Sequence, residues 1–212
     1  MEHQDGPDRR FAAALRLTAE LGAARIAGFV PEAERAPLLD CCQRLAYEPQ
    51  PEVVGLVRQE MELCALRPED LEGRGLAPLR SLLERYLAAV RRTAAEPGFR
   101  WLAGLAPNEV YVQRYRAGSA GITSHRDRKT FVRLIGIVSL GAPVTFQTSL
   151  QREGPPLTRF PVESGDLVLL RGHGFGKRPD RRPFHAVSGP ESGVRYSVTF
   201  RMNRKAPRAA LP

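Results

Sequence analysis

The carboxyl-terminal half of this 212-residue chain carries its hydrophobic residues with a period of two, which is the period of β-strands. From Asn108 onward, short alternating or apolar segments are separated by glycines and prolines, which interrupt strands. The pattern predicts strands at residues 109–116, 131–140, 144–148, 157–161, 166–171, 184–188 and 194–202. Short strands at such regular intervals favour a closed or double-sheet structure such as a jelly roll.

The amino-terminal third has a helical pattern. Residues 11–21 are rich in Ala and Leu, residues 24–30 predict a short strand, and Pro31 with Glu32 favours the first turn of another helix. An apolar stripe at residues 79–92 predicts a helix that packs on a sheet, whereas residues 48–77 are expected to be irregular. The predicted fold class is α+β: a double-stranded β-helix (jelly roll) core with amino-terminal helices packed on one sheet.

No Gly/Ser linker or repeat divides the chain, so we expect a polar, helical extension at residues 1–23, one domain at 24–203 and a flexible tail at 204–212. No apolar run reaches the ~18 residues of a membrane span, and no secretory signal is visible. Three cysteines, two of them adjacent, favour reduced thiols in a cytoplasm. We expect no membrane partner and a monomer.

A net charge of +9 makes a polyanion such as nucleic acid a plausible partner. Nearly all of the positive charge is arginine, however, with lysine only at positions 129, 177 and 205. A GC-rich genome would give the same composition without any selection for binding. The charge therefore leaves both interpretations open.

The motif with the clearest chemistry is His125-Arg-Asp127. In an extended segment, residues two apart project to the same side. An imidazole and a carboxylate so placed, joined by a second histidine, form the facial triad that holds Fe(II) and leaves other positions open. His185 is the preferred third ligand, and His173, in a glycine-rich loop, is the alternative.

The last predicted strand has a polar face, made of Arg195, Ser197, Thr199 and Arg201. The first has one made of Glu109, Tyr111, Gln113 and Tyr115. Solvent exposure explains such a face in many antiparallel sheets. Beside a metal motif, we interpret these faces as the lining of a cavity for a charged ligand.

Five elements in this order resemble the AlkB-like branch of the Fe(II)/2-oxoglutarate dioxygenases over residues 24–203. They are Gln113-Arg-Tyr115, residues 118–121, His125-Arg-Asp127, Pro183-Phe-His185 and Arg195-Tyr-Ser-Val-Thr-Phe-Arg201. The resemblance implies Fe(II) bound by His125, Asp127 and His185, with 2-oxoglutarate and dioxygen as co-substrates. It also implies that Arg195 and Tyr115 hold the far carboxylate of 2-oxoglutarate and that Arg201 lies near its metal-bound end.

The chain departs from the family pattern at three places. Gln113 and Ser197 stand where the family usually has asparagines, and both remain candidates for co-substrate binding. Residues 48–77 contain no Phe, Tyr or Trp, although nucleic-acid repair members use aromatic residues there to hold an extruded base.

The resemblance leads us to expect hydroxylation of a substrate C–H bond, with oxidative dealkylation of N-alkylated nucleobases in single-stranded or damaged nucleic acid as the first hypothesis. The alternatives are hydroxylation of a polar or anionic small molecule and, third, a non-catalytic β-sandwich binding protein. Tyr111 and the cations Arg126, Arg128 and Lys129, with Arg133 nearby, are the expected substrate contacts at the cavity mouth. The charge run Arg178, Asp180, Arg181 and Arg182 is expected to be a solvated loop.

Overall fold

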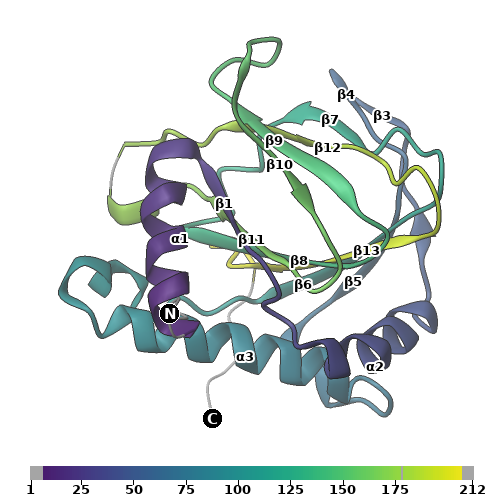
Figure 1. Ribbon diagram of the computed structural model, residues 1–212, viewed down its shortest axis with the longest axis horizontal. Helices are drawn as coiled ribbons and strands as arrows, with labels where there is room; N and C mark the ends of the chain where they lie inside the picture. Colours follow the sequence, from purple (N-terminus) through teal and green to yellow (C-terminus); the bar gives the residue numbers. More distant parts are fainter. Residues whose placement is uncertain (1–6, 178, 207–212) are drawn as a thin grey trace, which may run out of the picture.

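The computed structural model describes residues 7–177 and 179–206. Two antiparallel sheets face each other in the double-sheet arrangement of a jelly roll (Figure 1). The larger sheet has seven strands in the spatial order β1 (Ala23–Ile26), β11 (Leu167–Arg171), β8 (Leu134–Gly141), β13 (Arg195–Arg201), β6 (Glu109–Tyr115), β5 (Glu62–Leu66) and β2 (Glu48–Pro49).

The smaller sheet has four strands in the order β10 (Pro156–Val162), β9 (Val144–Ser149), β12 (Phe184–Val187) and β7 (Ile122–His125). A separate hairpin, β3 (Val53–Val54) and β4 (Val57–Arg58), lies beside β7 at the upper right of Figure 1. Three short 3-10 helices complete the described elements: η1 (Pro68–Glu72), η2 (Pro97–Leu102) and η3 (Phe175–Lys177).

Helices cover the outer face of the larger sheet: α1 (Pro7–Leu21), α2 (Glu32–Gln43) and α3 (Ala77–Ala94) (Figure 1). Tyr86 on α3 is fully buried and stacks on Phe200 of β13, with ring centroids 5.1 Å apart. Gly136 on β8 permits this approach, because a Cβ there would lie 2.6 Å from the Tyr86 ring. None of the described helices is long and apolar enough to cross a membrane.

The alternation of β13 separates two environments. Tyr196, Val198 and Phe200 belong to the core between the sheet and the helices. A second core lies between the two sheets and includes Ile137 and Phe146. The polar residues of β13 therefore face the space between the sheets, as the alternation predicts.

The seven predicted carboxyl-terminal strands and the helical stripes are confirmed, with boundaries shifted by a few residues. Among these strands, the largest shift is at residues 131–133, which precede β8, because Arg133 has a φ of +65° that a strand does not accommodate. The first helix begins at Pro7, ahead of the helical pattern recognised at residues 11–21. The first six residues and residues 207–212 lie outside the described part of the chain.

The expectation of an irregular segment at residues 48–77 was wrong. Strands β2 to β5 form there, and β5 extends the larger sheet by pairing with β6 from Glu62 to Leu66. An ion pair stabilises this ladder, since Arg114 donates to both carboxylate oxygens of Glu62 at 2.6 and 2.9 Å. The strand pairing is between distant residues, so the local sequence pattern did not show it.

Candidate metal and co-substrate site

The fold brings His125, Asp127 and His185 together. His125 ends β7 and His185 lies directly opposite it on β12. One ligand atom from each of the three side chains lies within 4.8 Å of the other two, the only such cluster among the described residues. Gly121 lets β7 approach this closely: its φ is +71°, and a Cβ there would lie 2.2 Å from the Val187 carbonyl oxygen.

The rival ligand His173 is not part of this cluster. Its Nδ1 lies 3.4 Å from a carboxylate oxygen of Asp180. The structure therefore places His185, and not His173, beside the His-x-Asp motif.

The protonation states of the cluster suit a metal ion. Burial and the neighbouring His125 lower the pKa of His185 to about 3, so its imidazole is neutral at pH 7. Burial raises the pKa of Asp127, but Arg201 and the two histidines outweigh it and hold the pKa below its usual value. Asp127 Oδ2 is buried and has no hydrogen-bond partner in the described residues, which leaves it free for a cation. Two imidazoles and one carboxylate are the ligand set that fits Fe(II).

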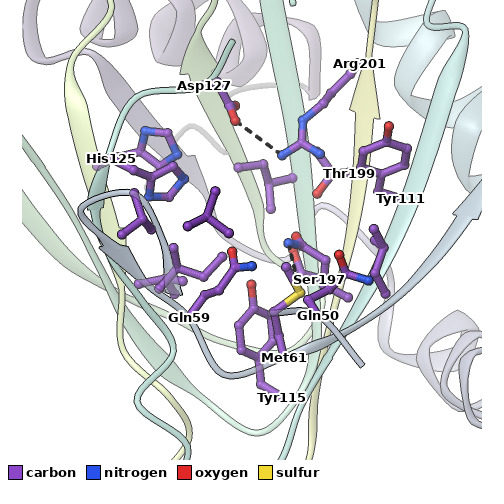
Figure 2. A pocket seen from close by; sticks show the side chains of 18 of the residues that line it. Gln50, Gln59, Met61, Tyr111, Tyr115, His125, Asp127, Ser197, Thr199 and Arg201 are labelled. Atoms are coloured by element: carbon purple, nitrogen blue, oxygen red, sulfur yellow. Dashed lines mark hydrogen bonds and ion pairs between the residues drawn. The ribbon is translucent and has the colours of Figure 1, made fainter. Parts of the chain in front are cut away.

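The polar faces of β13 and β6 meet beside the cluster. Their register pairs Arg195 with Tyr115, Ser197 with Gln113 and Thr199 with Tyr111. These six residues and the three ligand candidates line one cavity of about 490 Å³. Figure 2 shows Asp127 and Arg201 directed toward each other at one end of this cavity and Tyr115 at the other.

The surroundings of Arg195 suit it to bind an anion. It is 2% exposed, its Nε donates to Ser139 Oγ at 2.9 Å, and its guanidinium lies 5.0 Å from the Tyr115 ring centroid. Its Nη1 is buried and has no partner in the described residues. A buried, unpaired guanidinium nitrogen is costly unless a ligand satisfies it, and a carboxylate suits it best.

Arg201 lies nearer than Arg195 to the three candidate metal ligands. One of its Nη atoms is 3.6 Å from Asp127 Oδ1, and the guanidinium lies 5.1 Å from the Tyr111 ring centroid. Gln113 contacts Met61, with Nε2 3.7 Å from the sulfur. This arrangement leaves Arg195 as the deeper anion receptor and Arg201 as the cation beside the metal ligands.

The expected substrate cations divide into two groups. Arg126 and Arg128 line the cavity, and Arg126 also stacks on Phe184 with a guanidinium-to-centroid distance of 4.1 Å. Lys129 is exposed outside the cavity lining. The expectation that Arg133 lies at the mouth was wrong, because its Nη1 donates to the Ala103 carbonyl at 2.8 Å, away from the cavity.

Arg182 is a residue of the site that the sequence interpretation missed. It was expected in a solvated loop, but it is 8% exposed and donates to the backbone carbonyl of Asp127. It also donates to both carboxylate oxygens of Asp180 at 2.8 Å. Arg182 thus connects Asp127, a candidate metal ligand, to Asp180 in the loop before β12. The preceding Arg181 is exposed, and Arg178 lies outside the described residues.

The comparison with family models decides the family. The model of the 2OG-Fe(II) oxygenase superfamily matches residues 26–201. The chain belongs to this superfamily. Its members use Fe(II), 2-oxoglutarate and dioxygen, so the AlkB-like resemblance, the oxidoreductase class and the expected cofactors are confirmed.

The chain is also similar to two curated AlkB proteins. It is 31% identical to the alpha-ketoglutarate-dependent dioxygenase AlkB of Salmonella typhimurium over 122 residues, which are 55% of this chain and 53% of that protein. It is 32% identical to the Escherichia coli AlkB over 105 residues, 47% of each protein. The matched region thus spans about half the length of these relatives.

Solved structures confirm the jelly-roll fold. A 2OG-Fe(II) oxygenase family oxidoreductase from Burkholderia pseudomallei superposes with a TM-score of 0.69 at 17% identity, covering 97% of this chain and 98% of that one. A prolyl hydroxylase from Trichoplax adhaerens, solved in complex with a hypoxia inducible factor peptide fragment, gives 0.67 at 13% identity over 93% and 91% of the two chains. At these identities the likeness shows the fold alone.

Proposed function

We propose that this oxygenase removes alkyl groups oxidatively from N-alkylated nucleobases in single-stranded or damaged nucleic acid. The similarity to AlkB proteins at 31% and 32% identity carries the proposal. The cations Arg126 and Arg128 at the cavity support it, because cations beside the site can meet backbone phosphates. The alkyl carbon would be hydroxylated and then lost as an aldehyde.

In this proposal the protein positions and shields the reactants. His125, Asp127 and His185 would hold Fe(II), which supplies the oxidising chemistry with dioxygen and 2-oxoglutarate. Arg195 would pair with the far carboxylate of 2-oxoglutarate, and Tyr115 would face the same end of the co-substrate. Arg201 would keep Asp127 ionised. The apolar side chains between the sheets, including Ile137 and Phe146, would exclude water from the reacting carbon.

A second candidate function is hydroxylation of a small polar or anionic molecule. The lining supports it, since the part of the cavity contributed by residues 50–63 carries aliphatic, amide and thioether side chains and no aromatic ring. These side chains are Gln50, Pro51, Val54, Val57, Gln59, Met61 and Leu63. A base held there would lack the stacking partner that base-flipping enzymes use.

Aldehyde release from an N-methylated single-stranded oligonucleotide distinguishes the two functions. The assay contains Fe(II), ascorbate and 2-oxoglutarate under air, with the unmethylated oligonucleotide and the Asp127→Ala protein as controls. Dealkylation predicts aldehyde only with the methylated strand and the wild-type protein, and an oligonucleotide affinity that falls steeply with salt. Succinate formation without aldehyde or oligonucleotide stimulation would favour the small-molecule function.

A further inference from the structure

A segment of the chain spans the edges of the two sheets at the cavity. We call residues 50–61 the hairpin arm; it leaves β2, contains β3 and β4, and returns to β5. Val54, Val57 and Gln59 of the arm line the cavity. Its turn is open to solvent, since Leu56 is 79% exposed. Figure 1 shows β3 and β4 projecting beside β7, the strand that ends at His125.

The arm is bonded to β7 through one side chain of that strand, beside an antiparallel backbone bridge between Gln59 and Ile122. Thr123 Oγ1 accepts a hydrogen bond from the Arg58 backbone N–H at 2.9 Å and lies 3.2 Å from the Arg58 carbonyl, to which it donates. Just before β7, Glu60 N donates to the Gly121 carbonyl at 2.9 Å. The Thr123 hydroxyl therefore satisfies both backbone groups of one arm residue.

The same residue also contacts the metal-ligand candidate. The Thr123 carbonyl oxygen lies 2.8 Å from His125 Nδ1. Since a carbonyl only accepts, Nδ1 carries the hydrogen, and the lone pair of the imidazole is on Nε2. A hydrogen bond of this kind fixes the tautomer and the ring orientation of a metal-binding histidine.

We propose that Thr123 is a positioning residue that couples the hairpin arm to the metal site. Its side chain holds the arm, its carbonyl holds His125, and the two contacts share one residue of β7. Ordering of His125 by a metal ion then stabilises the bonded position of the arm, and the bonded arm strengthens metal binding by the same factor. The inference rests on His125 as a metal ligand and holds for either candidate substrate.

Hydrogen exchange and Mn(II) affinity test this coupling without turnover. In the wild-type protein, we expect Mn(II) to slow exchange of the Arg58 amide. Thr123→Val keeps the β-branched shape and removes the hydroxyl, so it should abolish this effect and weaken Mn(II) binding about five-fold. Thr123→Ser retains the hydroxyl and should behave as the wild type does.

Thr158→Val is the matched control, because Thr158 lies on β10, at the opposite edge of the same sheet from β7. It should change neither measurement.

A Thr123→Val protein that loses Arg58 protection but binds Mn(II) like the wild type would overturn the coupling and leave Thr123 as an anchor of the arm only. The coupling would also be overturned if Mn(II) slowed exchange of the Arg58 amide in Thr123→Val as much as in the wild-type protein. If the wild-type protein bound no Mn(II), the metal site itself would fail. Loss of oligonucleotide dealkylation alone would leave the coupling intact.

Discussion

His125 and His185 face each other directly across the β7–β12 ladder, with ring centroids 4.1 Å apart. Burial disfavours a positive charge on the His185 ring, and the neighbouring His125 adds to that effect. The pair is consequently ready to bind a metal ion at neutral pH without first releasing a proton from His185. The same relationship makes the fold sensitive to acid.

Metal-free protein should lose stability as the pH falls below about 6.5. The pKa of His185 is lowered from 6.5 to about 3, so between these values the unfolded state binds a proton that the folded state does not. Stability therefore rises with pH through this window, and the contribution is lost progressively toward pH 3. Thermal melts with a chelator, taken from about pH 6.5 to 5, avoid most carboxylate titration.

His185→Gln should have a flatter melting profile over that range than the wild-type protein. Equal slopes in the wild type and in His185→Gln would show that another group is responsible.

Arg195→Ala should raise the 2-oxoglutarate concentration needed for half-maximal succinate formation by about 30-fold or more, since removal of one partner of a buried ion pair costs ~2 kcal/mol or more. Arg159 is exposed on β10 and lies outside the co-substrate cavity, so Arg159→Ala is the matched control. An unchanged requirement in Arg195→Ala would place the carboxylate anchor elsewhere.

Arg182→Met should destabilise the protein by about 2 kcal/mol, because the donors to the Asp127 carbonyl and to Asp180 are lost while the apolar volume is kept. It should also weaken Mn(II) binding through displacement of Asp127. Arg181→Met changes the exposed neighbour and should stay within about 0.5 kcal/mol of the wild type. Urea denaturation measures both variants, and equal stabilities would refute the structural role of Arg182.

Gly136→Ala should cost about 1–3 kcal/mol, since the added methyl group would displace the Tyr86 ring from the sheet. Gly98→Ala is a suitable comparison, because nothing lies within 4 Å of the position of its Cβ. If Gly136→Ala melts like Gly98→Ala, the packing of α3 is looser than the structure indicates.

The sequence predicted the parts of the site that depend on local spacing. His125 ends β7 and Asp127 follows two residues later, so both side chains reach the cavity as the spacing predicted, and the period of β13 places Arg195 and Arg201 in the same cavity. The strands of the carboxyl-terminal half were predictable for the same reason. These features need no knowledge of which strands are neighbours.

The missed features depend on contacts between distant segments. Ser139 lies in an otherwise apolar strand, and only the pairing of β8 with β13 brings it to Arg195. Arg182 is buried and donates hydrogen bonds to Asp180 and to the Asp127 backbone, which a run of charges does not reveal. Likewise, β5 is a strand because β6 pairs with it.

Succinate formation from 2-oxoglutarate tests the central claim most directly. The wild-type protein and Asp127→Ala are compared under air with Fe(II) and ascorbate, after circular dichroism has verified that both are folded. We predict succinate formation by the wild-type protein and only a background amount of succinate with Asp127→Ala, because the variant lacks the carboxylate among the three candidate metal ligands. Wild-type succinate yields from a folded Asp127→Ala protein would contradict the assignment of the site.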